Sequence, residues 1–385
     1  MTDLGGLRVA LLGSISFPTP PAGYGPWEQM ASNLAEGMSA RGLDITLFAT
    51  GNSRTRARLA SVVPLSLSDD PAQNGEVASA LHIANLFARA GEFDLIHNNF
   101  DWKPLTYALA SVTPPLLTTI HGFSSPPILG AYYAAAGRSF YCSISDADRD
   151  PGLDYLATTY NGIDLAEFTF VDRPGEYLVF LGRFHPEKGT HLAIEIAKRA
   201  GVRLKIAAIP QDLEYFKNEV EPHIDGDRVQ FLGPVEREAR NELLGNALAL
   251  VHMVTRPERF GLTLVEAMAC GTPVLGANLG SIPEIVVDGE TGFVCDSVDE
   301  AVRRVPYLAK LSRRACRNRV EKTFSLERMI ERYLDVYREA LRLGTPLAPS
   351  VERLAARAVD WWDRPMAFTD LPPKPRAALS PPFER

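Results

Sequence analysis

The chain has 385 residues, 46% of them hydrophobic and 23% charged, which is the composition of a globular protein long enough for two domains of about 150 residues. Its net charge of −7 gathers in residues 1–170, where nine Lys and Arg face sixteen Asp and Glu, and this acidity argues against a broad nucleic-acid surface or an anionic membrane face. No apolar run approaches the roughly 18 residues that span a bilayer, and the start of the chain predicts a first strand rather than a signal peptide.

Short apolar segments alternate with longer amphipathic ones along most of the chain. This alternation predicts parallel strands with helices on both faces of each sheet. In the first half we expect strands at 7–13, 44–50, 94–99, 116–122 and 140–145, and helices at 26–40 and 75–90. In the second half we expect strands at 177–184, 203–209, 229–235, 248–254, 272–278 and 291–296, and helices at 189–200, 212–221, 236–246, 262–270 and 281–287.

The alternation breaks at 158–168 and then restarts, which predicts an α/β fold of two Rossmann-like domains facing each other across a cleft. We place the first domain at 1–168, the second at 172–342, and a proline-rich tail with one short helix at 343–385. Ligands of parallel sheets bind at the carboxyl ends of the strands, so the cleft is the expected site.

The cysteines and histidines show no metal-site spacing. Because the four cysteines are scattered without a CxxC pair, we expect free thiols in a cytoplasmic protein, with peripheral attachment to a membrane as the alternative location. The seven histidines have no H-x3-H spacing, so no metal is expected. The basic cluster at 303–322 is interpreted as a solvated helix face rather than a lipid or polyanion site.

The most informative run is ERFGLTLVEAMACGTPVL at 258–275. Glu258 and Glu266 stand eight positions apart around a Phe-Gly-Leu turn, and the helix behind them ends at a glycine followed closely by proline. The first turn of this helix, at 260–262, presents unpaired N–H groups and a partial positive charge, which favour an anion. Two carboxylates beside an anion site suit a ligand with phosphate and several hydroxyls, such as a nucleotide sugar.

Further sequence motifs accompany this run in a recognisable order. The second half contains GRFHPEKG (182–189), FLGPV (231–235), GSIPEIV (280–286) and DGETGFV (288–294), and the first half contains the looser GYGPWE (23–28), HNN (97–99), TTIHGF (118–123), SISDADR (143–149) and YNGID (160–164). Through these motifs, residues 7–342 resemble the retaining glycosyltransferases of family four. This group includes glycogen synthases and mannosyltransferases and has the GT-B fold.

The resemblance implies a reaction and a division of labour between the domains. The enzyme would move a hexose from a nucleoside-diphosphate sugar to a hydroxyl of a sugar or small glycoside. UDP-sugars are the first donor that the family suggests, and GDP-mannose is the second. The first domain would bind the acceptor and the second would bind the donor, with no further cofactor. The oligomeric state cannot be read from the sequence.

Arg183 lies at the end of a predicted strand and Lys188 precedes a helix, so both cations can reach one pyrophosphate and stabilise its growing charge in the transition state. The resemblance implies that Glu266 holds the ribose hydroxyls and that Glu258 contacts the donor sugar. It also implies that His121 positions the sugar near the anomeric carbon, not as a nucleophile. The expected catalytic residues are therefore His121, Arg183, Lys188 and Glu258. The expected donor-binding residues are Gly25, Gly182, Arg183, Lys188, Glu258, Phe260, Gly261, Leu262 and Glu266.

The loop at 20–29 lies where a phosphate or acceptor loop belongs, but Pro26 stands where many relatives have a second glycine. Proline lacks an N–H, so Pro26 holds no phosphate through its amide and instead suits the first turn of a helix. Trp27 suits stacking on an acceptor sugar and core packing equally well. The expected acceptor wall consists of Tyr24, Trp27, Asn98, Asn99, Asp101 and Trp102.

Asp146-Ala147-Asp148 matches the D-x-D metal motif of another glycosyltransferase fold, but Ser145 before it favours a helix cap closed by Asp148. The resemblance offers no carboxylate nucleophile of the kind that retaining glycosidases use. We therefore expect metal-independent front-face substitution. The alternatives are a nucleotide-sugar epimerase of the same fold and a non-catalytic sugar-nucleotide binding protein. A glycan phosphorylase would need a pyridoxal-phosphate lysine motif, which we do not find.

Overall fold

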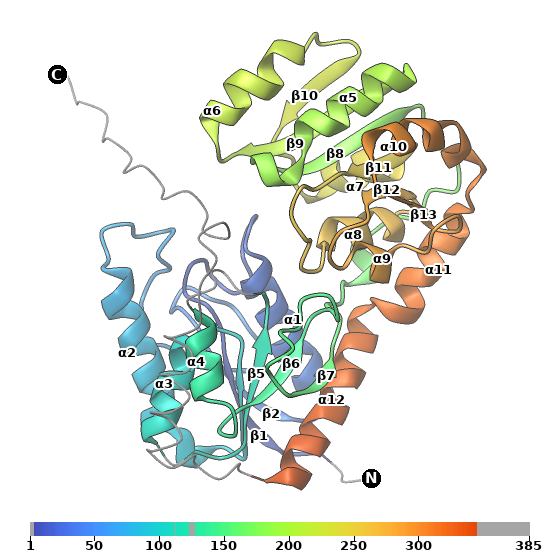
Figure 1. Ribbon diagram of the computed structural model, residues 1–385. Helices are drawn as coiled ribbons and strands as arrows, with labels where there is room; N and C mark the ends of the chain where they lie inside the picture. The colour runs from blue at the N-terminus through green and yellow to red at the C-terminus, as the bar shows by residue number, and fades with distance from the viewer. Residues whose placement is uncertain (1–3, 112, 123–127, 345–385) are drawn as a thin grey trace, which may run out of the picture.

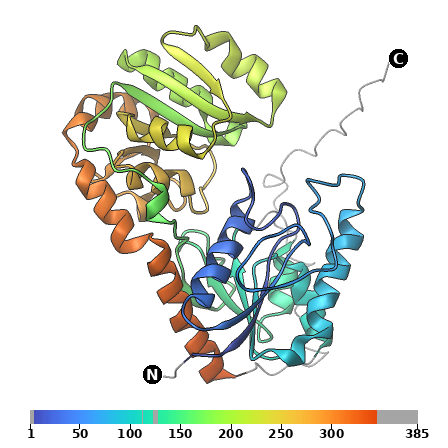
Figure 2. The ribbon, with the colours of Figure 1, turned by 180° about the vertical axis from the view of Figure 1, so that it is seen from behind.

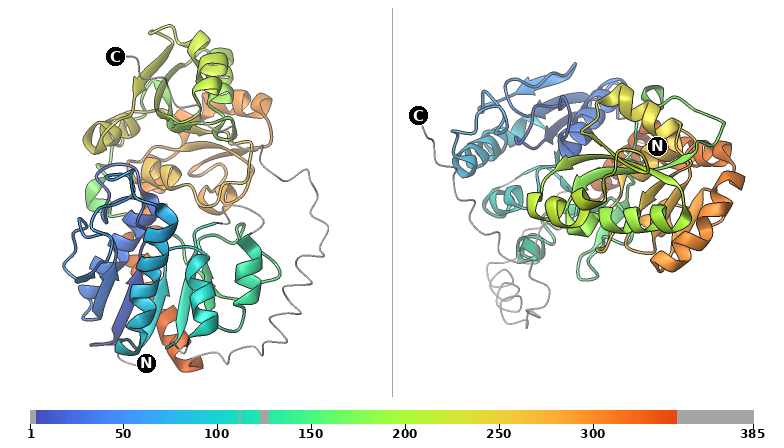
Figure 3. Two further views of the ribbon diagram at one scale, coloured as in Figure 1. Left: turned by 90° about the vertical axis from the view of Figure 1, so that its left-hand side faces the viewer. Right: turned by 90° about the horizontal axis from the view of Figure 1, so that it is seen from above.

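The computed structural model describes residues 4–111, 113–122 and 128–344, which form two α/β domains, each built on one parallel sheet (Figure 1). Figure 3 shows the two domains from two further sides. The predicted fold class is confirmed. The predicted tail at 343–385 lies outside the described residues from 345 onward. No helix in the described ranges is long and apolar enough to cross a membrane.

The first sheet has seven strands in the order β3-β2-β1-β4-β5-β6-β7. The strands are β1 (Arg8–Leu12), β2 (Asp44–Phe48), β3 (Arg58–Ala60), β4 (Leu95–Asn98), β5 (Leu116–Ile120), β6 (Phe140–Ser143) and β7 (Tyr155–Thr158). β1 is buried from Val9 onward and β5 is buried along its whole length, so neither strand alternates between buried and exposed residues. The helices are α1 (Pro26–Ser39), α2 (Gly75–Ala88), α3 (Lys103–Ala110) and α4 (Leu129–Ala134). The strand order reverses between β1 and β4, where parallel sheets of this kind bind ligands.

The second sheet has six strands in the order β10-β9-β8-β11-β12-β13. The strands are β8 (Tyr177–Phe184), β9 (Arg203–Pro210), β10 (Val229–Gly233), β11 (Ala249–His252), β12 (Val274–Ala277) and β13 (Gly292–Cys295). The helices between and after them are α5 (Thr190–Ala200), α6 (Leu213–Tyr215), α7 (Arg237–Gly245), α8 (Leu262–Ala269), α9 (Ile282–Ile285), α10 (Val298–Arg304) and α11 (Arg313–Thr323). The order reverses between β8 and β11, so the carboxyl ends of these two strands meet.

The last helix, α12 (Leu326–Leu343), returns to the first domain and runs along it (Figures 1 and 2). Its apolar face belongs to the same buried cluster as β1 and α1. Gly37 of α1 permits the close approach, since a Cβ there would lie 2.6 Å from Cδ1 of Ile330. The predicted second domain at 172–342 therefore needs correction, because α12 covers the core of the first domain.

A buried polar network fixes α12 to the first sheet. The two ring nitrogens of His97 are hydrogen-bonded to the Tyr337 hydroxyl and to Oγ1 of Thr119, each at 2.8 Å, and Thr119 is bonded in turn to Tyr333 at 2.9 Å. Buried polar groups need such partners, so this network ties the helix to β4 and β5 in one register.

The buried His82 and His97 and the partly buried His121 make the stability of the protein sensitive to acid. Burial lowers the pKa of His82 to about 4, of His97 to about 3 and of His121 to about 4. The unfolded chain binds these protons near pH 6.5, so the stability that the neutral rings contribute is present above that pH and is lost as the pH falls toward 4. We expect the free energy of unfolding to decrease between pH 6.5 and 4, with a slope of up to about 4 kcal/mol per pH unit.

Urea unfolding at pH 7, 6 and 5 tests this expectation. Replacing His82 by glutamine, which keeps a donor for the Gly13 carbonyl, should lower the slope by about 1.4 kcal/mol per pH unit. His223 is exposed, so replacing it by glutamine should leave the slope unchanged. A stability that does not vary between pH 7 and 5 would contradict the prediction.

From the sequence, the basic cluster at 303–322 is interpreted as a solvated helix face, but two of its arginines are largely buried and hydrogen-bonded to the backbone. Arg313 is only 4% exposed, and its guanidinium donates to the carbonyls of Val171, Gly245 and Ala247 and to the Thr272 hydroxyl. Arg317 donates to the carbonyls of Phe168 and Ala269. These arginines satisfy backbone groups where the chain enters the second domain, which basic composition alone does not reveal.

Candidate functional site

Glu258 is the centre of a charged cluster in the second domain. Its Oε2 accepts a hydrogen bond from Nζ of Lys188 at 2.7 Å and lies 2.8 Å from Nε2 of His252, and its side chain is 12% exposed. Burial alone would raise the pKa of Glu258, but the hydrogen bond and charge of His252, together with Lys188, outweigh burial and hold the pKa well below its ordinary value. The cluster therefore contains a carboxylate in direct contact with a cation.

Local backbone geometry brings Lys188 to Glu258. Lys188 ends a 3₁₀ turn, and Gly189 after it adopts φ 68°. A Cβ at Gly189 would lie 1.9 Å from the Met253 carbonyl, so only glycine lets this turn reach the end of β11. Sequence reasoning missed His252. The signal available was a histidine near the carboxyl end of the predicted strand at 248–254, because ligands of parallel sheets bind at that end.

Glu266 lies on α8 with one carboxylate oxygen occupied and one not. Oε1 is 3.3 Å from Nη1 of Arg240, a residue of α7 that the sequence analysis did not select. Oε2 of Glu266 and Nε of Arg240 are buried without a hydrogen-bond partner in the described structure. Burial raises the pKa of Glu266, and Arg240 opposes that shift. An unpartnered buried carboxylate oxygen is costly, so this oxygen is a candidate to receive a ligand hydroxyl.

Arg183, at the end of β8, points toward the first domain. Its Nη1 donates to Oε1 of Gln211 at 2.6 Å, and its guanidinium carbon lies 5.9 Å from the centre of the Tyr24 ring. Tyr24 belongs to the loop before α1, so this contact joins a predicted donor residue to a predicted acceptor residue. Gly182 is within β8, where it pairs with Ala208.

The turn before α8 has no side-chain cap among the described residues, and the role predicted for its amides stays a prediction. Gly261 is the N-cap, with φ 84° and no side-chain cap, and Leu262 begins the helix. Phe260 is buried, and its carbonyl accepts a hydrogen bond from the Ser281 hydroxyl at 2.9 Å. Phe260 thus anchors the turn in the core, and the first amides of α8 remain for an anion.

In the first domain, His121 contacts two predicted residues. Its Nε2 is 2.9 Å from Oδ1 of Asn99, and its ring stacks on Trp27 with centroids 5.9 Å apart. Asn99 is buried, with no partner for Nδ2 among the described residues. Because burial lowers the pKa of His121 to about 4, its ring is neutral at pH 7. Gly25 is the N-cap of α1, ahead of Pro26 in the first turn.

Three residues of the predicted acceptor wall hold a loop instead. Asn98 is fully buried; its Oδ1 accepts from the Phe100 amide, and its Nδ2 donates to the Asp101 carbonyl and the Thr118 hydroxyl. Asp101, at φ 131°, accepts a hydrogen bond from the Tyr132 hydroxyl, and Trp102 packs on the core. Asn98 is therefore removed from the wall, because both ends of its amide are bonded within the protein.

The D-x-D segment makes contacts between the domains. Oγ of Ser145 accepts from the Asp148 amide at 3.2 Å, as expected of a cap, but no helix follows. The carboxylate of Asp148 pairs with Arg259 of the second domain at 2.9 Å. Across the described ranges, no group of three or more His, Cys, Asp or Glu side chains is arranged to hold a metal ion. The expectation of metal independence stays a prediction.

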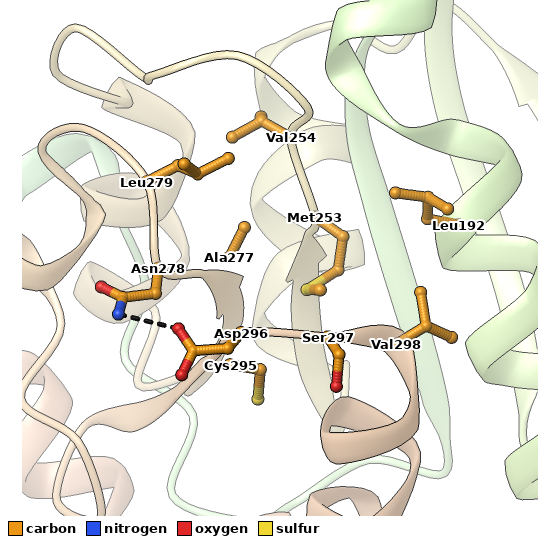
Figure 4. Close-up of a pocket in the computed structure, with 10 residues that line it drawn as sticks. All are labelled: Leu192, Met253, Val254, Ala277, Asn278, Leu279, Cys295, Asp296, Ser297 and Val298. Atoms are coloured by element: carbon orange, nitrogen blue, oxygen red, sulfur yellow. Dashed lines mark hydrogen bonds between the residues drawn. The ribbon is translucent and has the colours of Figure 1, made fainter.

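A pocket of about 350 Å³ lies at the carboxyl ends of β11, β12 and β13 (Figure 4). It is mainly apolar, and two of its three polar side chains, Asn278 and Asp296, are hydrogen-bonded to each other at 2.9 Å, while the third is Ser297. None of the predicted site residues lines it. The pocket shares no lining residue with the Lys188–Glu258–His252 cluster, although Met253 of its lining directly follows His252.

Two family models match the chain. The model of glycosyl transferases group 1 matches residues 167–323, and that of glycosyltransferase family 4 matches residues 28–149. The glycogen synthase of Mycobacterium tuberculosis is 26% identical over 85% of this chain and 94% of its own.

Solved structures share the fold. The sucrose-phosphate synthase of Thermosynechococcus elongatus aligns with a TM-score of 0.70 at 20% identity over 88% of this chain and all of its own. HepE of Anabaena, in complex with UDP-glucose, aligns with a TM-score of 0.64 at 20% identity over 86% of this chain and all of its own.

Proposed function

The chain belongs to the group 1 glycosyltransferases, and we propose that it is a retaining hexosyltransferase that uses a nucleoside-diphosphate sugar and acts on a hydroxyl of a sugar or small glycoside. The observation that carries this proposal is the Lys188–Glu258–His252 cluster, together with the unpartnered carboxylate oxygen of Glu266. A cation for phosphate and two carboxylates for hydroxyls match the two chemical parts of such a donor.

Each part of the donor has a place in this arrangement. Oε2 of Glu266 would accept a ribose hydroxyl, and Glu258 would accept hydroxyls of the sugar. Lys188, Arg183 and the first amides of α8 would hold the diphosphate, whose negative charge grows as the glycosidic bond breaks. The HepE structure of the same fold holds UDP-glucose, so UDP-sugars are the first donors to test and GDP-mannose is the second.

We propose front-face substitution without a metal. The bond from the anomeric carbon to the phosphate oxygen breaks, the acceptor oxygen bonds to that carbon on the same face, and the acceptor proton moves to the departing phosphate oxygen. His121, neutral and oriented by Asn99 and Trp27, would position the sugar. Excluding water from the reacting atoms limits hydrolysis of the donor.

A thermal-shift screen against UDP, GDP, ADP and dTDP and their common sugars, without added metal, tests the proposal. A ligand at a hundred times its Kd stabilises the folded state by about 2.7 kcal/mol. We expect one nucleotide to raise the Tm and Glu266→Ala to remove that rise. Glu195→Ala, which alters a carboxylate on the outer face of α5, is the matched control and should keep the full shift.

The absence of a shift with every nucleotide at millimolar concentration would contradict the proposal. A shift followed by sugar transfer to an added acceptor supports it. Interconversion of two nucleotide sugars without an acceptor would select the epimerase, and binding without turnover would select the non-catalytic protein.

A further inference from the structure

Arg259, the residue after Glu258, contacts both domains through its backbone and its side chain. Its amide donates to Oε1 of Glu258 at 3.2 Å, which fixes the carboxylate oxygen that Lys188 and His252 do not hold. Its carbonyl accepts a hydrogen bond from the Ser145 hydroxyl of the first domain at 2.6 Å. One residue thus orients the predicted donor carboxylate and bonds the opposite domain.

The side chain of Arg259 crosses to the loop that carries His121. Its Nη1 pairs with Oδ1 of Asp148 at 2.9 Å, and the Asp148 side chain is only 8% exposed. Its Cδ occupies the space beside Gly122, where a Cβ would lie 2.0 Å away. Gly122 follows His121 directly, so the aliphatic part of Arg259 lies against the backbone next to the predicted sugar-positioning histidine.

A second contact holds the same segment of the first domain. The carboxylate of Glu284, on α9, accepts hydrogen bonds from the amides of Asp146 and Ala147 at 2.9 and 2.7 Å and from the Tyr160 hydroxyl at 3.1 Å. α9 is itself tied to Glu258, since the Ser281 amide donates to the Glu258 carbonyl at 2.9 Å. The segment at 145–148 is therefore held to the second domain by two residues, Arg259 and Glu284.

We propose that Arg259, through its ion pair with Asp148, is a positioning residue that sets His121 opposite Glu258 and so couples donor binding to sugar transfer. This inference rests on the proposed function. Lys188, Glu266 and the amides of α8 bind the nucleotide part within the second domain and do not need the pair. Alignment of the sugar between the two domains does need it, because a misplacement of about 1 Å at reacting atoms costs about 10²-fold in rate.

The test compares Arg259→Met, Arg259→Lys and Asp148→Asn for nucleotide binding, transfer and donor hydrolysis. We expect Arg259→Met and Asp148→Asn to bind UDP or the preferred nucleotide within about twofold of the wild type. We expect their transfer kcat to fall by about 10²-fold, with hydrolysis gaining at least tenfold relative to transfer. Arg259→Lys, which keeps the charge and the aliphatic stem, should recover most of the transfer rate.

Asp299→Asn is the matched control, because it removes one partner of the Arg199–Asp299 ion pair on the outer face of the second domain. It should leave binding, transfer and hydrolysis unchanged. Unaltered transfer in Arg259→Met, or a parallel loss of nucleotide binding and transfer in all three variants, would overturn the inference. A wild-type protein that binds no nucleotide would overturn the proposed function as well, which separates the two failures.

Discussion

Replacing Lys188 by methionine is expected to lower kcat for sugar transfer by about 10²–10³-fold while the protein stays folded. Lys188 is the cation in direct contact with Glu258, at 2.7 Å. A fixed cation stabilises a leaving diphosphate most in the transition state, where its charge is greatest, so the loss should appear in kcat rather than only in KM. Methionine keeps most of the side-chain volume, which confines the change to the charge.

Steady-state kinetics with saturating donor, together with Tm, provide the measurement. Lys198→Met is the matched control, since Lys198 lies in the last turn of α5, where it contacts His223 at the exposed surface. It removes the same charge from the same domain and should leave kcat unchanged. Full activity of Lys188→Met would show that Lys188 does not stabilise the leaving diphosphate. It would also show that the Lys188–Glu258 ion pair is not needed for transfer.

The sequence predicts the architecture well where the pattern is local. Most of the strands are short segments in which apolar residues are the majority, and their alternation with helices predicts a parallel sheet. The position of α12 is different. Its apolar face is visible in the sequence, but the surface that this face covers is not, because a stripe of Met329, Tyr333 and Tyr337 fits either domain until the chain is folded.

In the candidate site too, residues in sequence motifs are predicted, and contacts that depend on the fold are not. Glu258 and Lys188 are seventy positions apart. The sequence predicts that they share a site only because both belong to motifs of the same family. His252, Arg240 and Arg259 were not selected, because their contacts with Glu258, Glu266 and Asp148 form only when the chain is folded. Asn98 was wrongly placed on the acceptor wall, because an asparagine that holds a buried turn looks identical in sequence to one that faces a ligand.

Arg313→Met is expected to destabilise the folded protein by about 3–5 kcal/mol. The guanidinium donates to three backbone carbonyls and one hydroxyl in an environment where the side chain is 4% exposed. Removing it takes this donor from the Val171 and Gly245 carbonyls, and each unsatisfied buried group costs about 1–3 kcal/mol, whereas the Ala247 carbonyl keeps a hydrogen bond from the Gly175 amide. Lysine is expected to recover only part of the loss, because a compact ammonium cannot match the planar fork of arginine.

Urea unfolding followed by circular dichroism measures the change, with Arg303→Met as the matched control. Arg303 belongs to the same basic cluster but is exposed on α10, so its replacement should change the free energy of unfolding by no more than about 0.5 kcal/mol. Equal stability of the two variants would mean that the Arg313 hydrogen bonds contribute nothing net. A large difference would instead show that Arg313, unlike the exposed Arg303, stabilises the second domain. Its hydrogen bonds join the backbone at Val171 to the segments that follow α7 and α8.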